Sequence, residues 1–267
     1  MRKLFSSAFL LVFLTLKLSA QTAPDFQIHS HNDYLQKVPF WTAYHAGASS
    51  IEVDVILKDG RLMVAHEPES TNPSRTLESL YLTPILQGLK SGIISSLDFH
   101  LLVDLKTEAY STLEVLEKSL EGYQDILYGP SNPTGLKLVI SGNRPKPSDY
   151  GKYPDWMLFD YQSLDLNKDL PWEKIGMVSL SFRQFSVWNG KGGIVEAEKQ
   201  RVQDFIDRVH SFGKPVRFWA SPDSKSAWRT FREMGVDYIN TDVPVEAANY
   251  LKTLSVNVYQ NTSFHSV

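Results

Sequence analysis

Two acidic residues interrupt an otherwise apolar segment, residues 50–55, at alternate positions. Single aliphatic residues flank and separate Glu52 and Asp54 there. Because side chains i and i+2 of a strand point to the same side, both carboxylates would lie on one face and the aliphatic side chains on the other. Asp104, near the end of a later apolar segment, can add a third carboxylate. Oxygen ligands suit a hard cation, so we predict that Glu52, Asp54 and Asp104 bind one Mg²⁺ or Ca²⁺ ion.

A positively charged residue follows the third carboxylate. Lys106 lies two residues after Asp104 and would project to the same side of a strand. An isolated buried charge is costly, so this ammonium must be paired by carboxylates or by an anionic substrate. The alternatives are a strand whose carboxylates face water, and a Lys106 that pairs with Glu108 in solvent.

Two histidines follow apolar segments that lie close to these carboxylates in the sequence. His31 closes the segment that begins at residue 26, and His66 follows a short returning strand after the hairpin turn at residues 58–61. Imidazoles with a pKa near neutrality, placed beside a metal-held anion, are what general acid/base catalysis requires. We therefore predict that His31 and His66 form an acid/base pair. His29, two residues before His31, is expected to support the site through hydrogen bonds.

Apolar, β-branched segments alternate with amphipathic ones along the chain. Strands are predicted at residues 26–29, 50–55, 101–105, 136–140, 156–159, 177–181, 215–219 and 238–240. Helices are predicted at residues 40–46, 77–90, 111–122, 196–212, 225–234 and 245–254. This alternation and the number of strands indicate an α/β fold built as a single (β/α)8 TIM barrel. A doubly wound open sheet is the alternative, but no Gly-x-Gly-x-x-Gly motif follows the first strand.

The first twenty residues have the three-part layout of a secretory signal peptide. Arg2 and Lys3 precede an apolar stretch, and Ser19 and Ala20 precede Gln21. We expect residues 1–20 to be removed, leaving one domain at residues 21–267 of a secreted or periplasmic protein; a retained anchor is the alternative. No other segment has the apolar length needed for a stable membrane span. The chain contains no Cys, which excludes disulfide scaffolds and thiolate metal sites.

The net charge argues against nucleic acid as a partner. The chain has 27 Lys and Arg residues against 30 Asp and Glu residues, a formal charge of −3. Loss of residues 1–20 would remove Arg2, Lys3 and Lys17 but no acidic residue, which lowers the charge to −6. An acidic chain without a basic cluster is poorly matched to a phosphate backbone. The expected partner is a small molecule, and the sequence indicates no oligomeric state.

The order of these motifs resembles that of the glycerophosphodiester phosphodiesterase and phosphatidylinositol-phospholipase C-like superfamily. Its common form has His-Arg-Gly, then Gly-x-x-x-x-Glu-x-Asp, then His-Asp; the matching stretches here are residues 31–33, 47–54 and 66–67. Residues 104–107, Asp-Leu-Lys-Thr, and 219–223, Trp-Ala-Ser-Pro-Asp, are similar to the sphingomyelinase D branch. The opening His-Ser-His-Asn-Asp-Tyr most resembles an uncharacterised secreted branch of the "altered inheritance of mitochondria" type. The resemblance spans about residues 26–250.

The resemblance implies a metal-dependent phosphoric diester hydrolase that acts on glycerophosphodiesters or phospholipid headgroups. The metal ligands it implies are Glu52, Asp54 and Asp104, the acid/base pair is His31 and His66, and the substrate contacts are Asn32, Lys106 and Trp219. Asn32 replaces the family's Arg, which normally contacts the phosphate. One alternative is a non-catalytic barrel that binds phosphorylated or carbohydrate ligands. Another is a glycoside hydrolase that uses Glu52 or Asp54, which leaves both histidines without a role.

Overall fold

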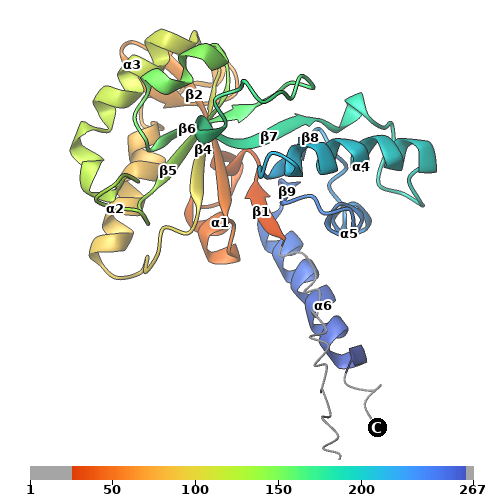
Figure 1. Cartoon of the computed structure of the whole chain (residues 1–267). Coiled ribbons are helices and arrows are strands. Elements are labelled where there is room, and N and C mark those ends of the chain that lie inside the picture. The colour runs from red at the N-terminus through yellow and green to blue at the C-terminus, as the bar shows by residue number, and fades with distance from the viewer. Residues whose placement is uncertain (1–25, 263–267) are drawn as a thin grey trace, which may run out of the picture.

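A closed ring of eight parallel strands forms the centre of the molecule (Figure 1). The computed structural model describes the backbone of residues 26–262 and the side chains of residues 26–254, so the expected signal peptide lies outside the described residues. The ring runs in the order β1-β9-β8-β7-β6-β5-β4-β2 and closes through pairing of β1 with β2. Its strands are β1 (Gln27–Ser30), β2 (Ser50–Lys58), β4 (His100–Leu105), β5 (Lys137–Gly142), β6 (Met157–Tyr161), β7 (Ile175–Ser181), β8 (Val216–Trp219) and β9 (Tyr238–Thr241). The predicted TIM barrel is confirmed.

One strand lies outside the ring. β3 (Arg61–Val64) pairs antiparallel with the far end of β2 and forms the predicted hairpin, whose turn has Asp59 and Gly60 at positive φ. This extension carries the chain past the carboxyl end of the barrel and back, so that His66 returns close to Asp54 in the middle of β2.

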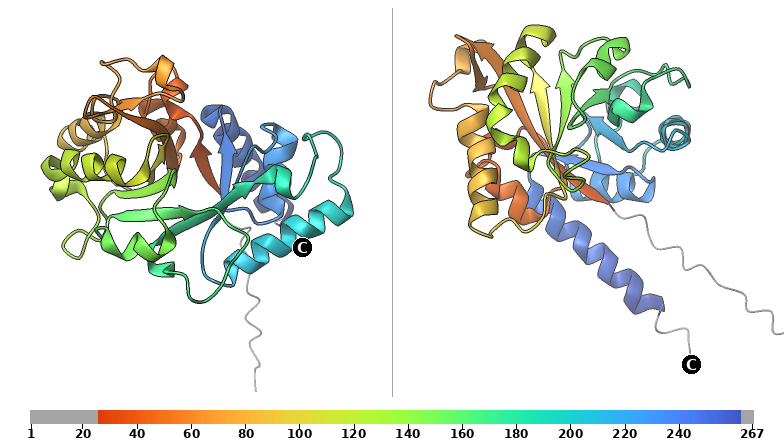
Figure 2. Two further views of the ribbon diagram at one scale, coloured as in Figure 1. Left: turned by 90° about the horizontal axis from the view of Figure 1, so that it is seen from above. Right: turned by 60° about the vertical axis from the view of Figure 1, so that its left-hand side comes forward.

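Among the described residues, six α-helices follow barrel strands; five pack around the barrel, while α6 extends away from it, as Figure 2 shows from two further directions. They are α1 (Trp41–Ala46), α2 (Thr83–Lys90), α3 (Ala109–Ser119), α4 (Glu196–His210), α5 (Lys225–Glu233) and α6 (Pro244–Thr262). The first turns of the predicted helix at 77–90 are a π-helix, Glu78–Leu82. The connections before and after β6 contain 3-10 turns, Pro147–Lys152 and Trp172–Lys174, in place of α-helices. Prolines at 145, 147, 154 and 171 explain this, because Pro cannot donate the helical hydrogen bond.

The strand pleat divides side chains between two environments. On β2, Ile51, Val53 and Val55 are fully buried and belong to the main core, which lies between the barrel and its helices. Glu52 and Asp54 point into the barrel, as the alternation predicts. Strand residues in an α/β barrel are covered on both faces, so these carboxylates lose most of their contact with water.

The barrel interior changes from apolar to polar along its axis. A small separate cluster of buried residues fills its lower part: Leu102, Val139, Met177 and Tyr238. Two residues further along the same four strands stand the polar residues Asp104, Ser141, Ser179 and Asn240. An apolar layer therefore lies beneath a polar one that opens toward the carboxyl ends of the strands, where barrel enzymes place their catalytic groups.

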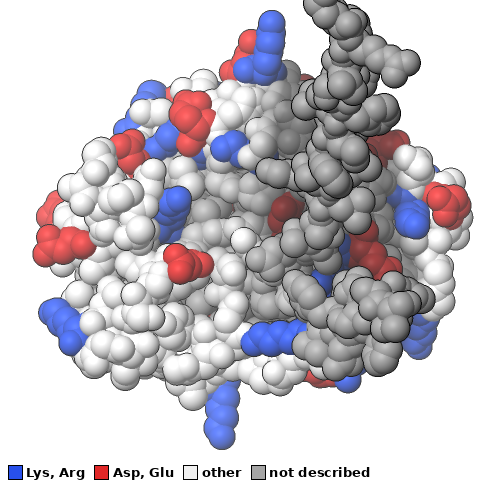
Figure 3. Space-filling model, turned by 60° about the horizontal axis from the view of Figure 1, so that its bottom comes forward, with Lys and Arg blue, Asp and Glu red and all other residues white. Residues whose placement is uncertain are grey.

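The described surface offers no large region of one charge on the face seen in Figure 3. Lys and Arg side chains are interspersed there with Asp and Glu over the part that described residues form. No helix among the described residues is long and apolar enough to cross a membrane.

Candidate active site

Three carboxylates converge where the middle of β2 pairs with the carboxyl end of β4. One oxygen from each of Glu52, Asp54 and Asp104 lies within 4.8 Å of the others. The pairing of β2 with β4 causes this, because Asp54 is directly opposite Asp104 in the register, and Glu52 is two residues earlier on the same face. The structure thus brings together the three residues that the sequence singled out, and their role as metal ligands stays a prediction.

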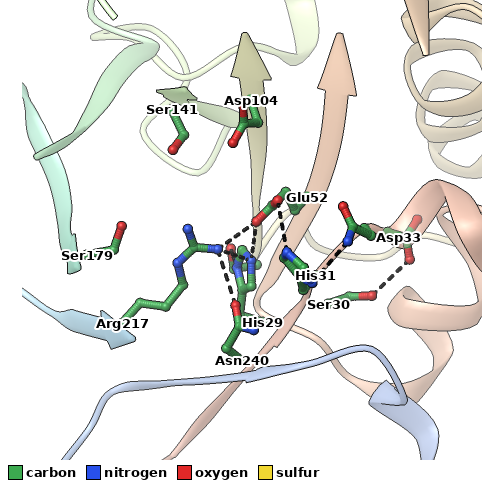
Figure 4. Close-up of polar contacts among 12 residues, drawn as sticks. His29, Ser30, His31, Asp33, Glu52, Asp104, Ser141, Ser179, Arg217 and Asn240 are labelled. Atoms are coloured by element: carbon green, nitrogen blue, oxygen red, sulfur yellow. Dashed lines mark hydrogen bonds and ion pairs between the residues drawn. The ribbon is translucent and has the colours of Figure 1, made fainter. Parts of the chain in front are cut away.

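Buried cationic and neutral donors hold one oxygen of Glu52 (Figure 4). Its Oε2 accepts hydrogen bonds from His29 Nε2 at 2.7 Å and from Arg217 Nη1 at 2.6 Å. The other oxygen, Oε1, lies 3.8 Å from His31 Nε2. Burial alone would raise the pKa of Glu52, but the Arg217 guanidinium and the His29 hydrogen bond hold it well below the usual range. Glu52 is therefore ionised at neutral pH.

The two oxygens of Asp54 have different surroundings. Oδ2 accepts hydrogen bonds from the Tyr34 hydroxyl at 2.9 Å and His66 Nδ1 at 2.7 Å, and lies 3.2 Å from Lys106 Nζ. Oδ1 is buried and has no hydrogen-bond partner among the described residues. A buried carboxylate oxygen without a partner is costly, and a cation removes that cost. This oxygen and the oxygen-only donor set fit a hard divalent cation.

The ammonium of Lys106 lies between two of the three carboxylates. Its Nζ is 3.2 Å from Asp54 Oδ2 and 3.2 Å from Asp104 Oδ1. Burial, followed by the charge of Glu52, raises the pKa of Asp104 to about 6 despite this contact. Lys106 therefore pairs with Asp54 and Asp104, as expected for a largely buried ammonium, and not with Glu108. That residue instead accepts hydrogen bonds from the first backbone amides of α3.

Both predicted acid/base histidines are anchored through the same ring nitrogen. His31 Nδ1 is hydrogen-bonded to Asp242 Oδ1 at 2.7 Å, and His66 Nδ1 to Asp54 Oδ2 at 2.7 Å. Burial alone would lower the pKa of His31, but the Asp242 hydrogen bond and the charge of Glu52 give a net increase. In each residue a carboxylate fixes the ring and leaves Nε2 for proton exchange.

His29 has the supporting position that the sequence suggested. It is fully buried, and its ring joins Ser50 Oγ at 2.6 Å to Glu52 Oε2 at 2.7 Å. Burial and the charge of Arg217 lower the pKa of His29 to about 3, so the ring is neutral. A neutral imidazole can donate to Glu52 without competing with the positive charge of Arg217.

Arg217 is the main residue of the site that sequence reasoning missed. It projects from β8, is almost completely buried and contacts both His29 Nε2 and Glu52. Its Nη2 also lies 3.8 Å from Oδ2 of the buried Asp160 on β6, which accepts hydrogen bonds from Ser141 and Ser179. The sequence does contain one indication of this role: Arg217 is a charged residue within the apolar segment 215–219 and lies on the opposite side of the strand from Phe218.

The remaining predicted substrate contacts lie at the same end of the barrel. Asn32 has left-handed backbone geometry, with φ of 47°, and its Nδ2 is 3.2 Å from His31 Nδ1. Trp219 ends β8 on the same side of the strand as Arg217 and is partly exposed. Asp33, in the position of the family's Gly, is buried and accepts hydrogen bonds from the Phe40 amide and the Tyr81 hydroxyl. The substrate roles of Asn32 and Trp219 stay predictions, whereas Asp33 stabilises the turn into α1.

Comparisons with known proteins identify the family of the chain. Residues 17–129 match the model of the AIM6-like phosphodiesterase domain, and residues 215–244 match that of the glycerophosphoryl diester phosphodiesterase family. The altered inheritance of mitochondria protein 6 homolog of Arthroderma benhamiae is 32% identical over 84% of this chain and 83% of its own length. The altered inheritance of mitochondria protein 6 of Kluyveromyces lactis is 25% identical over 84% of this chain and 71% of its own.

A solved structure shares the fold. The crystal structure of a glycerophosphodiester phosphodiesterase from Parabacteroides distasonis superposes with a TM-score of 0.57 over 88% of this chain and 99% of that chain, at 15% identity. At that identity the likeness concerns the barrel alone, while the sequence matches concern the family. The chain belongs to the AIM6-like phosphodiesterase family, within the glycerophosphodiester phosphodiesterase-like superfamily.

Proposed function

We propose that the protein is a divalent-metal-dependent phosphoric diester hydrolase that acts on glycerophosphodiesters or phospholipid headgroups. One observation carries the proposal: three converging carboxylates lie beside two histidines whose Nδ1 atoms are anchored by Asp242 and Asp54. This is the donor set of a hard-metal site with an acid/base pair next to it. The family supports phosphodiester chemistry in general.

Glu52, Asp54 and Asp104 are the residues that would hold the cation. When bound, it supplies Lewis-acid stabilisation of the negative charge on the phosphoryl oxygens. Asp54 would then have two tasks, because its Oδ1, which has no hydrogen-bond partner among the described residues, would be the oxygen that binds the cation, while Oδ2 fixes the ring of His66. Lys106 adds a positive charge next to the cation site, where it can contact the substrate phosphate. This charge would partly replace the Arg of the family's motif, which is Asn32 in this chain.

The two histidines move the protons of the reaction. The Nε2 of one ring accepts a proton from the attacking hydroxyl, which belongs to water or to a neighbouring alcohol of the substrate. The Nε2 of the other ring donates a proton to the departing alkoxide, so that a neutral alcohol leaves. The P–O bond to the nucleophile forms as the P–O bond to the leaving group breaks. Each Nδ1 stays bound to its carboxylate throughout, which keeps the rings oriented.

The test uses two soluble diesters, bis(p-nitrophenyl) phosphate and glycerophosphocholine. We expect hydrolysis that a chelator abolishes and that Mg²⁺ or Ca²⁺ restores. Asp54→Asn and Asp104→Asn should lose this activity, whereas Glu121→Gln, an exposed residue after α3, serves as the matched control and should keep it. Hydrolysis that survives chelation and both substitutions would contradict the metal assignment. If the wild-type protein hydrolyses neither diester, the proposal that it is a phosphodiesterase is contradicted.

A second candidate is a barrel that binds phosphodiesters without cleaving them. The specific observation in its favour is Asn32 in place of the motif's Arg, since the phosphate loses a guanidinium there. Titration calorimetry with glycerophosphocholine and Mg²⁺, followed by phosphorus NMR of the mixture, separates the two functions. Binding with no product over many hours would favour the binding protein.

We also propose that the protein is exported by the signal peptide at residues 1–20. The layout of basic, apolar and small residues supports this. Intact-mass measurement of the protein from its native host should give a chain that begins near Gln21. A full-length chain in that measurement would contradict cleavage.

A further inference from the structure

A cavity of about 470 Å³ lies at the amino ends of β5, β6, β7 and β8, opposite the end that carries the three carboxylates. Its lining includes Lys137, the first residue of β5, Ile175, the first residue of β7, and the residues just before β8. Leu158 of β6 also lines the cavity and packs against the apolar layer of the barrel. The layer therefore separates this cavity from the catalytic end. A cavity of this volume can hold a small organic molecule.

Three lysine side chains line this cavity: Lys137, Lys174 and Lys214. Lys174 is only 7% exposed, and the other two are half-buried. Among the described residues, none of the three ammonium groups has a carboxylate oxygen within 4.0 Å. A charged group that loses contact with water is normally paired with an opposite charge, and these three have no such partner in the described part of the chain.

Two of the ammonium groups contact neutral groups instead. Lys174 Nζ donates hydrogen bonds to the backbone oxygens of Pro154 at 2.7 Å and Tyr153 at 3.0 Å. Lys137 Nζ lies 4.4 Å from the centre of the Tyr128 ring, whose face attracts a cation. These contacts hold both side chains at the cavity wall, but they leave the positive charges uncompensated.

Two acidic residues, Asp155 and Glu173, also line the cavity, but both are exposed. Their charges do not cancel the effect of burial, which lowers the pKa of Lys174 and of Lys214. The lining thus has three positive and two negative formal charges, a net of +1, in a chain whose formal charge is −3. The folded protein disfavours the charged form of these lysines, and an anion in the cavity would remove that cost.

The lining indicates the chemical class of the anion. Lysine binds phosphate as a point charge, and three lysines around one cavity suit an anion with more than one negative charge. A phosphate monoester has a charge of about −1.5 to −2 at pH 7, whereas a carboxylate has only one negative charge. Tyr128, Pro130 and Ile175 give the cavity an apolar part as well, against which a short carbon chain can pack.

We propose that this cavity binds the phosphate monoester of a small alcohol, with the phosphate among Lys137, Lys174 and Lys214 and the carbon chain against the apolar residues. The site lies on the other side of the apolar layer from the catalytic residues and does not depend on the proposed function. Hydrolysis of a phosphodiester releases a phosphate monoester. If the proposed function is correct, the catalytic end therefore releases a product of the class that the amino end binds.

Titration calorimetry with glycerol 3-phosphate tests this site, with a chelator present so that no metal recruits phosphate to the catalytic carboxylates. A hydrogen bond to a charged group changes affinity by about tenfold or more, so Lys137→Met and Lys214→Met should each weaken binding by at least that factor. Lys174 is left unchanged because it also binds the backbone before β6. Lys90→Met, at the exposed end of α2, is the matched control, and Lys106→Met reports on the catalytic end; both should bind as the wild type does.

Inorganic phosphate and glycerol, titrated separately, distinguish the two parts of the ligand. Inorganic phosphate should bind several times more weakly than glycerol 3-phosphate because it makes no contact with the apolar part of the cavity. Glycerol should not bind, because it has no charge for the lysines. Equally tight binding of inorganic phosphate would overturn the assignment to a monoester.

A measurement on the wild-type protein does not depend on the folding of any variant. Lysines are modified with an amine-reactive reagent and analysed by mass spectrometry, and glycerol 3-phosphate should slow the modification of Lys137 and Lys214 but not that of Lys90. The absence of both binding heat and protection at millimolar ligand overturns the proposal. A loss of binding in K106M or K90M as large as that in K214M overturns it too. If the protein hydrolyses no diester, the proposed function fails, whereas these results still decide the role of the amino-end cavity.

Discussion

Replacing Arg217 by Met tests how the barrel interior tolerates its charges. The guanidinium is almost fully buried, lies 2.6 Å from Glu52 Oε2 and stands near the equally buried Asp160. Methionine fills a similar volume but leaves both carboxylates without their cation. Removing one partner of a buried ion pair costs about 3–5 kcal/mol of the free energy of unfolding. In a domain of this size that corresponds to a fall in Tm of roughly 6–20 °C.

The pH dependence of this loss identifies its cause. In the wild type the pKa of Glu52 lies below its ordinary value of 4.5, so its contribution to stability is present above that pH and disappears as the pH falls. Without Arg217, the largest influence that opposes burial is lost, so the folded-state pKa of Glu52 rises and its contribution to stability at neutral pH shrinks. The deficit of Arg217→Met relative to wild type should therefore be larger at pH 7 than at pH 4.

Urea unfolding, followed by tryptophan fluorescence at both pH values in the presence of a chelator, measures the deficit. The double variant E52Q/R217M also removes the carboxylate charge that Arg217→Met leaves unpaired. Its loss of unfolding free energy at pH 7 should therefore be smaller than the sum of the two single losses, by about 1–3 kcal/mol. A deficit below about 1 kcal/mol, a deficit independent of pH, or strictly additive single losses would each refute the reasoning. Glu121→Gln is the control for an exposed carboxylate.

Three further predictions concern single groups. His31→Ala and His66→Ala should each lower kcat by roughly a hundredfold to ten-thousandfold with metal affinity nearly unchanged in calorimetry, and full activity in either would remove that residue from the mechanism. Lys106→Met should depress kcat more than substrate affinity, because the extra negative charge develops mainly in the transition state; a change confined to affinity would indicate a binding protein. Burial and neighbouring positive charges lower the pKa of His100 to about 3. Below pH 6.5 the unfolded chain therefore binds a proton at His100, whereas the folded chain does not. The free energy of unfolding falls as the pH drops for this reason. His100→Gln should make the curve of stability against pH shallower between pH 6.5 and 5, by up to about 1.4 kcal/mol per pH unit, and an unchanged slope in urea unfolding would contradict the assignment.

The barrel and the carboxylates could be predicted because they depend on local patterns. The pleat of residues 50–55 fixes the direction of Glu52 and Asp54, and parallel pairing of neighbouring strands then places Asp104 beside them. The partners of these groups depend on closure of the ring. Asp242 is 211 residues from His31, and Arg217 is 165 residues from Glu52, so no spacing rule connects them.

Other differences arise where local geometry overrides a simple pattern. Tyr34 lies in a 3-10 turn with no periodicity, so nothing in the sequence indicated its hydrogen bond to Asp54. The prolines around β6 replace two crossover helices with 3-10 turns. The role of Asp33 follows from the turn at Phe40, whose φ of 65° and Trp41–Pro39 hydrogen bond form a γ-turn.

The apolar layer of Leu102, Val139, Met177 and Tyr238 affects how small molecules can enter and leave the barrel. These side chains fill the lower part of the barrel, so in the proposed function the cation, the substrate and both products would share the entrance at the carboxyl ends of the strands. A product alcohol must leave by the path through which the next substrate arrives, and competitive inhibition by product follows from this geometry. A lipid substrate eases the conflict, because its apolar product returns to the membrane while the small polar product diffuses into water.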